Sequence, residues 1–415
     1  MKLFGINFGK KSGGEGDGYP DVLRRLLNQS RKSKSGPVVS KDTALQVGTV
    51  FACVRAIAEG VAQVPFSVMQ ETKSTVSVHP QRLPAKDHDL YDLLHRKPND
   101  WQTSFEFRET LVMHLALTGS AFVFINRARG KVAELIILDP GRVTVEQNAD
   151  WSISYKVSAK NGAPQPFAAE TIWHLRGPSW SGVNGLDVLR LAREAIGLSL
   201  VTEETHASLH ERGVQPSGMY SVDGVLNKEQ YKVLKDWIDD NNAGAKNVGK
   251  IMLLDRNAKF LPSAITGVDA QHLETRRYQV EEVCRFFRVM PIMVGYSDKA
   301  ATYASAEQMF LSHVVHTLMP WYERIQQSAE VNLLTKADRA AGYYIKLHEA
   351  GLLRGAMKDT SEYLYRLTTA GVMERNEARA KLDLNPLVGL DDPLTPLNMT
   401  TDPAGFGAQT GGSNA

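Results

Sequence analysis

The chain has 415 residues, is 43% hydrophobic and 23% charged, and so has the composition of a globular protein large enough for roughly two or three domains. Its two cysteines, Cys53 and Cys284, lie in apolar helical patterns, so we expect buried, reduced thiols. Two cysteines exclude a disulfide scaffold and a four-cysteine zinc site. The net charge of +2 argues against a repressor-like protein that grips duplex DNA, but not against a protein past which DNA slides.

The sequence gives no membrane or secretion signal. The most apolar stretch, residues 51–69, contains Arg55, Glu59 and Pro65, and is therefore interrupted well short of the roughly 18 apolar residues that span a bilayer. The N-terminus lacks an apolar segment followed by a small-residue cleavage site. We expect the protein to be made and kept in a cytoplasm, with no membrane partner.

Residues 1–41 carry nine Lys and Arg against three Asp and Glu, within pieces rich in Gly and Ser. This composition predicts a flexible basic arm. The arm either stays solvated or docks on an acidic partner or on nucleic acid.

The region 42–185 is predicted to be an α+β domain. Apolar residues at helical spacing predict a helix over 43–64 that Pro65 ends, and further helices over 90–94 and over 105–117, with Ser104 as N-cap and Gly119 at the end. Alternating apolar residues and turn signals predict strands over 66–69, 121–126, 132–138, 143–147, 153–157 and 171–175.

Two long helices are predicted to flank a small α/β insert. The first runs from Leu186 to about His210 and ends at Gly213 and Pro216. The insert contains a short strand near Met219, and then a helix over 228–240, an Asn- and Gly-rich turn and a strand over 250–255. The second long helix covers residues 269–289.

A loop punctuated by proline and glycine, residues 290–303, follows the second helix and leads into another long helix over 305–334. Pro320 lies inside that helix and should kink it. Residues 352–379 read as helical, and a Gly-rich tail follows Asn398. Two strong helices that hold a small polar loop suggest that the loop is placed for a purpose.

Two enzyme hypotheses compete with a structural function. Residues 244–250 have the spacing of a phosphate-binding loop, but Ile251 replaces the magnesium-binding Ser or Thr, and a helix rather than a strand precedes them. His206 and His210 are spaced like zinc ligands, but Ala207 stands where a zinc protease needs Glu. We favour a turn and surface histidines, and we expect no catalytic residues, no metal and no cofactor; a nucleotide-dependent enzyme remains the alternative.

Taken together, short motifs along the chain resemble the HK97-type phage portal protein family from about residue 44 to 394. The motifs that carry the resemblance are residues 51–59 with Pro65, 97–99, 119–122, 189–195, 215–218, 247–250, 269–276, 302–303 with 307–308, and 376–379. Their order and spacing are specific, although each alone is weak. The chain departs from the family at Ser120 and Ser305, where Asn is common, and at residues 288–291, where the family usually has Gly-Val-Pro-Pro.

The resemblance implies an α+β fold with an α+β wing, a helical stem, a small α/β clip and a helical crown, assembled into a ring. The implied segments are the flexible arm 1–41, wing 42–185, first stem helix 186–213, clip 214–268, second stem helix 269–290, tunnel loop 291–304, long kinked wing helix and following strand 305–348, crown 349–397 and disordered tail 398–415.

The implied function is that of a non-enzymatic ring, usually of twelve subunits, at one capsid vertex. Double-stranded DNA would be packaged and ejected through it without base readout. The implied partners are the terminase large subunit, the major capsid protein and scaffold, and the head-tail adaptor, with the protein in the virion and, during assembly, in the host cytoplasm. Another head-tail adaptor ring is a further alternative. The residues expected to line the DNA channel are Ser297, Lys299, Thr302 and Tyr303 of the tunnel loop and Arg276 and Arg277 of the second stem helix.

Overall fold

The computed structural model describes residues 33–158, 163–212, 218–221, 227–242, 259–262, 268–296, 303–349, 352 and 357–394. The chain divides into two units. Unit 1 comprises Met1–Val47 and Leu189–Gln279, and unit 2 comprises Gly48–Val188 and Val280–Ala415. None of the described helices combines the length and apolar character needed to cross a bilayer.

The first predicted helix is two helices in the structure. Helix α2 (Lys41–Gln46) begins at a capping box formed by Ser40 and Thr43, and it ends at Val47, whose backbone is extended. Helix α3 (Gly48–Ala62) then begins and buries one apolar face. The periodicity of the apolar residues continues through the break, which is why the sequence alone predicted one helix.

Helix α5 (Ser104–Thr118) packs against α3, and α4 (Asp89–His95) precedes it. The predicted N-cap Ser104 is wrong by one residue, because Thr103 forms a capping box with Glu106. Gly119 ends α5 in the left-handed conformation with φ 72°, as predicted. A Cβ at Gly119 would lie 2.0 Å from the carbonyl oxygen of Leu186. Position 119 therefore requires glycine for two reasons: there is no room for a side chain, and the backbone φ is positive.

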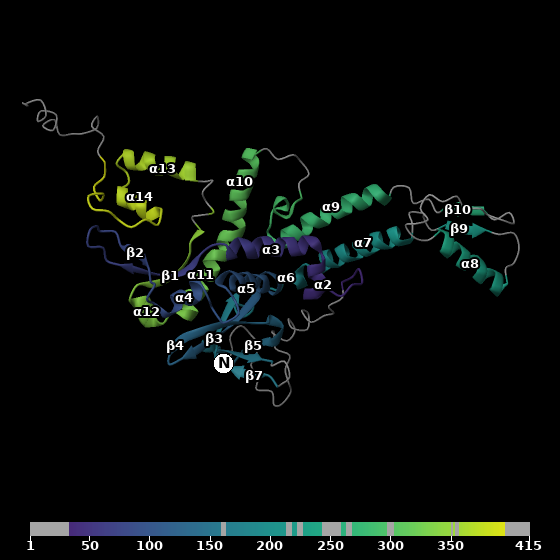
Figure 1. The fold of residues 1–415 in the computed structure, drawn as a ribbon, viewed down its shortest axis with the longest axis horizontal. Coiled ribbons are helices and arrows are strands. Elements are labelled where there is room, and N and C mark those ends of the chain that lie inside the picture. Colours follow the sequence, from purple (N-terminus) through teal and green to yellow (C-terminus); the bar gives the residue numbers. More distant parts are fainter. Residues whose placement is uncertain are drawn as a thin grey trace, which may run out of the picture. The chain divides into compact units, whose positions relative to one another are not determined.

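Three small antiparallel sheets complete unit 2. One sheet has the order β4-β3-β8, another β5-β6-β7 and another β11-β1-β2, so the last joins a strand near the chain's end to one near its start. Helix α5 lies against β3 and β4 (Figure 1). The strands are β1 (Phe66–Thr72), β2 (Gln81–Pro84), β3 (Ser120–Ala128), β4 (Lys131–Leu138), β5 (Val143–Gln147), β6 (Ile153–Val157), β7 (Gln165–Phe167), β8 (Ile172–Arg176) and β11 (Tyr343–Leu347). The short strands β2 and β7 were not predicted.

A buried histidine lies where the β4-β3-β8 sheet meets β6. The ring of His174 stacks on Phe122 at a centroid distance of 4.4 Å, and its Nδ1 lies 3.3 Å from the Tyr155 hydroxyl. Burial, and then the charge of Arg176, lower the pKa of His174 to about 3. Nδ1 also accepts a hydrogen bond from Arg176 Nε at 3.4 Å, so the imidazole is neutral and carries its proton on Nε2.

The long predicted helix is interrupted by one π-helical turn. Helix α10 (Tyr303–His313) passes through Val314–Leu318 in π geometry and continues as α11 (Met319–Leu333). Pro320 cannot donate a backbone hydrogen bond, and its ring would crowd the carbonyl one turn earlier. The π turn immediately before Pro320 widens the helix at that position, which gives the expected irregularity a specific form.

Helix α11 is held to two other parts of unit 2 by polar contacts. The Tyr322 hydroxyl donates to the carbonyl oxygen of Gly60 in α3 at 2.8 Å. Ser328 Oγ accepts from the indole of Trp173 in β8 at 2.9 Å, and the Trp173 side chain is fully buried. These bonds fix α11 against both a helix and a sheet.

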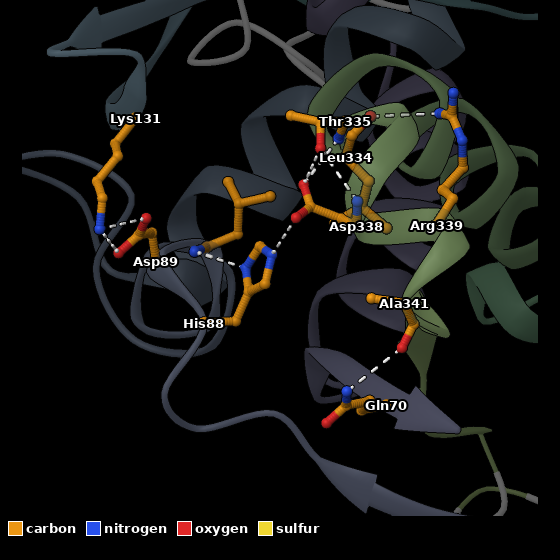
Figure 2. A network of polar contacts seen from close by, with 10 residues as sticks. Gln70, His88, Asp89, Lys131, Leu334, Thr335, Asp338, Arg339 and Ala341 are labelled. Carbon is orange, nitrogen blue, oxygen red and sulfur yellow. Dashed lines mark hydrogen bonds and ion pairs between the residues drawn. The ribbon is translucent and has the colours of Figure 1, made fainter. Parts of the chain in front are cut away.

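A second polar network surrounds the short helix α12 (Lys336–Ala340), as Figure 2 shows. Thr335 and Asp338 form the capping box that begins α12, and Asp338 also lies 3.7 Å from His88 Nε2. Arg339 donates to the Leu334 carbonyl at 3.3 Å, and Gln70 of β1 donates to the Ala341 carbonyl at 3.3 Å. The network joins β1 and the loop before α4 to the segment that leads into β11.

The C-terminal helices α13 (Met357–Thr369) and α14 (Arg375–Lys381) agree with the predicted helical content of this region. The buried Asn376 side chain donates to the Asp391 carboxylate at 2.8 Å, and Ser77 donates to the same carboxylate oxygen at 2.5 Å. His79 Nε2 lies 3.0 Å from Glu374. These contacts fasten the β1–β2 loop to α14.

Helix α9 (Val268–Phe287) begins in unit 1 and ends in unit 2, and its unit 1 part runs beside α7 (Arg193–Arg212) (Figure 1). Buried Gln279 of α9 donates to Thr202 of α7 at 3.3 Å. The predicted single helix from Leu186 is divided, since α6 (Val188–Leu191) is separate from α7.

The insert between these helices contains β9 (Gly218–Ser221), α8 (Lys228–Asn242) and β10 (Lys259–Pro262). Strand β9 pairs antiparallel with β10, which was not predicted. The strand predicted over 250–255 lies outside the described residues.

Candidate functional site

Helix α9 ends in a tight reversal just before the predicted tunnel loop. The backbone N–H of Val289 donates to the Cys284 carbonyl at 3.0 Å, and that of Arg288 donates to the Arg285 carbonyl at 3.1 Å. This pair of bonds is a Schellman motif, which places its reversing residue in the left-handed region. Here that residue is Arg288, with φ 55°, rather than glycine. The backbone at the entry to the loop is therefore strained.

The chain does not become irregular directly after this reversal. Residues Pro291–Val294 form one 3-10 turn that Gly295 ends in the left-handed conformation. Proline at the first position favours such a turn, since its fixed φ is already helical. The predicted loop 291–304 is thus shorter than expected at both ends, because α10 already begins at Tyr303.

A cavity of about 460 Å³ lies beside the end of α9. The last two turns of α9, the reversal, the start of the 3-10 turn, the end of α10 and the π turn supply its lining residues, which are Glu281, Cys284, Arg285, Arg288, Val289, Met290, Pro291, Ser312, His316 and Thr317. The Thr317 hydroxyl donates to the Arg288 carbonyl at 2.7 Å. The π turn therefore holds the strained residue from the other side.

Basic side chains are prominent around the cavity. Arg285 is 57% exposed and pairs with Glu282 at 2.5 Å and with Glu281 at 3.5 Å. Arg288 and His316 also line the cavity and are exposed. Such a site can attract an anion, but exposure leaves the charges screened by solvent and salt.

The two cysteines lie next to each other behind this wall. Cys53 of α3 and Cys284 of α9 are both free and buried, with their sulfurs 3.8 Å apart. The prediction that both cysteines are buried is confirmed, but their proximity was not predicted.

The predicted DNA-channel residues fall into two groups. Arg276 and Arg277 are exposed on α9, as a lining residue must be. Ser297, Lys299 and Thr302 lie outside the described residues, and Tyr303 is the first residue of α10, with its side chain not described. The side chains of these four loop residues therefore all lie outside the part of the chain that the structure describes.

The competing motifs gain no support from the described residues. His206 lies on α7, but the side chain of His210 is not described, and residues 244–250 lie outside the described part of the chain. Within the described ranges, one His and carboxylate set is close enough to hold a metal ion, His79 with Glu374 and Asp391. It is remote in sequence from the predicted loop, and its members already pair with protein groups.

Sequence reasoning missed Arg288 and the cavity. The signal for Arg288 was present, because the chain departs from the family pattern at the position where glycine usually stands. A left-handed helix end explains why the family prefers glycine there. The cavity has no local signal, because its walls come from segments about 25 residues apart that only the fold brings together.

Comparison with known proteins identifies the family. The phage portal protein family matches residues 48–383. The portal protein of Enterobacteria phage HK97 is 25% identical over 405 residues, which cover 92% of this chain and 94% of that protein. The probable portal protein of Streptomyces phage phiC31 is 27% identical over 388 residues, which cover 90% of this chain and 83% of that protein. The chain therefore belongs to the phage portal protein family.

A solved structure has the same fold. A chain from the neck of a native gene transfer agent particle, computed with C12 symmetry, superposes with a TM-score of 0.58 at 23% sequence identity. The superposition covers 88% of this chain and 99% of that chain. The mixed helix and sheet architecture predicted from the sequence is confirmed.

Proposed function

We propose that copies of this chain form the portal ring at one vertex of a capsid, through which double-stranded DNA is packaged and later ejected. The observation that carries the proposal is the family match over residues 48–383. The C12 symmetry of the related neck supports a ring of twelve subunits. A head-to-tail contact repeated about an axis closes into such a ring.

The paired helices α7 and α9 would form the stem that surrounds the DNA. Each has 20 residues and is therefore about 30 Å long, which suits the wall of a short channel. The small insert between them would form the clip that meets the terminase large subunit and later the head-tail adaptor. The α+β region would form the wing, in contact with the major capsid protein and scaffold.

The near-neutral chain supports sliding rather than gripping of DNA. A net charge of +2 gives the chain little overall basic excess for tight phosphate contacts, which would slow translocation. Exposed Arg276 and Arg277 on α9, together with Lys299, Ser297, Thr302 and Tyr303, would supply the weak contacts with the DNA backbone. Such contacts carry no sequence information, so any genome could pass.

End-on electron microscopy of the purified full chain tests the ring. We expect particles with a central hole and an outer rim of wings. A native protein that stays monomeric or dimeric, without an axial opening under all assembly conditions, would contradict the proposal.

A charge reversal tests the channel residues separately from the ring. We expect Lys299→Glu to assemble normally but to change the amount of DNA packaged or retained, because it puts a repulsive charge beside passing phosphates. Lys73→Glu is the matched control, since Lys73 is exposed just beyond β1 in unit 2. Equal packaging by both variants would remove Lys299 from the channel while leaving the ring proposal intact.

A further inference from the structure

The cysteine pair at the end of α9 has the arrangement of a reactive dithiol rather than of two unrelated core residues. Cys53 and Cys284 are separated by 231 positions in the chain, yet their sulfurs lie 3.8 Å apart. A disulfide bond is about 2.05 Å long, so the sulfurs must approach by less than 2 Å, a change that small side-chain rotations can supply. Both thiols are free.

One of the two cysteines borders on open space. Cys284 lines the cavity of about 460 Å³, whereas Cys53 does not. The Cys284 side chain is only 1% exposed, so the cavity brings small molecules to its edge while the fold still shields it from larger ones. Hydrogen peroxide, which is about the size of two water molecules, could enter such a space.

We propose that Cys53 and Cys284 form a peroxide-sensitive dithiol whose oxidation ties α3 to the last turn of α9 by a disulfide. The Cys284 thiolate attacks one oxygen of hydrogen peroxide, which leaves a sulfenic acid on Cys284 and releases hydroxide. The Cys53 thiol then attacks the Cys284 sulfur, loses its proton and displaces the sulfenic oxygen as water. In total two thiols and one peroxide give one disulfide and two waters.

The electrostatics of the pair support this order of events. The hydrogen bond with Cys53 lowers the pKa of Cys284, against the opposing effects of burial and of Glu281. The same hydrogen bond, followed by burial, raises the pKa of Cys53. Cys284 is therefore the better nucleophile and also the one at the cavity, while Cys53 is held as the protonated partner that resolves the sulfenic acid.

The position of the link determines its consequence. Cys284 supplies the carbonyl that accepts the Val289 N–H in the reversal at the end of α9. A disulfide at Cys284 would hold this reversal to α3 by a covalent bond instead of by packing alone. The effect concerns the internal stiffness of unit 2 and does not depend on the proposed passage of DNA.

Treatment of the folded full-length protein with hydrogen peroxide tests the dithiol. We expect both free thiols to be lost, peptide mass mapping to recover Cys53 linked to Cys284 within one chain, and dithiothreitol to restore both thiols. The same treatment in urea should give little of this link, because the unfolded chain no longer holds the two sulfurs together. Glutathione in the same tube serves as the control for active oxidant.

Single substitutions test the assigned roles. We expect Cys284→Ser to leave Cys53 as a free thiol after peroxide treatment, because Cys53 is fully buried and does not line the cavity. The mapping of the wild-type protein remains decisive even if this variant fails to fold. Thiols that both stay free after glutathione is fully oxidised, links only between chains, or equal link formation in urea would each overturn the proposal.

Discussion

Replacement of Arg288 by glycine should stabilise unit 2, although it removes the whole exposed side chain. Arg288 holds φ at 55° in the reversal that ends α9. An L-residue in this region costs about 1–2 kcal/mol relative to the right-handed conformation, and glycine avoids the cost. Glycine also has more conformational entropy in the unfolded chain, and this reduces the gain in stability by about 0.5–1 kcal/mol. The net expectation for Arg288→Gly is about 0.5–1 kcal/mol of added stability.

Arg288→Ala is the matched control, because it removes the same charge and side chain but keeps the Cβ. Its backbone strain is unchanged, so we expect no gain in stability. Urea unfolding followed by circular dichroism should therefore give a higher midpoint for the glycine variant than for the alanine variant. The oligomeric state must be matched between variants, since assembly itself shifts the apparent stability.

A glycine variant no more stable than the alanine variant would refute the reasoning from strain. If the glycine variant is more stable, the retention of arginine at this position requires another explanation. The side chain is exposed on the cavity wall beside the start of the predicted loop, where a positive charge could meet DNA phosphates. We then expect weaker DNA retention in both variants, because both lack the charge.

Three further predictions concern the scaffold of unit 2. Gly119→Ala should lower the free energy of unfolding by about 2–3 kcal/mol, because the added Cβ would collide with backbone atoms. Gly130→Ala is the control: Gly130 has a similar φ of 80° but open space around it, so its replacement should cost about 1 kcal/mol. Tyr322→Phe should cost about 1 kcal/mol in denaturant unfolding, because it removes the buried hydrogen bond to Gly60. Burial lowers the pKa of His174 to about 3 in the folded protein, whereas an unfolded histidine has a pKa of about 6.5. Between these two pH values His174 is protonated in the unfolded state but not in the folded state, so the free energy of unfolding should fall as the pH drops through this window. His174→Gln should flatten this pH dependence in unfolding measured across the window, and an unchanged slope would contradict it.

The sequence predicts the longest elements of the fold well, because their signals are local. Helices α5 and α9 have apolar residues at helical spacing, and the Gly119 stop is a property of glycine itself. Strands β3 to β6 follow alternating patterns bounded by turn residues. In contrast, β2 and β7 have four and three residues, too few for a pattern to be distinguished from a loop.

The breaks inside predicted helices depend on interactions that periodicity does not record. Helix α2 ends at Val47 because the backbone of that residue is extended, and the apolar pattern passes through this break unchanged. The irregularity near Pro320 was predicted from the chemistry of proline, but its form as a π turn was not. A π turn requires one extra residue per turn, and a sequence pattern over five residues cannot resolve that.

The least predictable features of this chain coincide at the end of α9, and they have one physical origin. Arg288, the π turn, the cavity and the cysteine pair all depend on the end of α9 meeting the π turn between α10 and α11 and, through the cysteine pair, α3, which lies more than 200 residues earlier in the chain. A strained reversal persists only where its surroundings hold it, and here the Thr317 hydroxyl binds the carbonyl of the strained residue. Thr317→Val, which keeps the shape and removes the donor, should therefore destabilise the wild type more than it destabilises Arg288→Gly. A double-mutant cycle in urea unfolding measures this coupling, and equal effects in both backgrounds would show that the hydroxyl does not support the reversal.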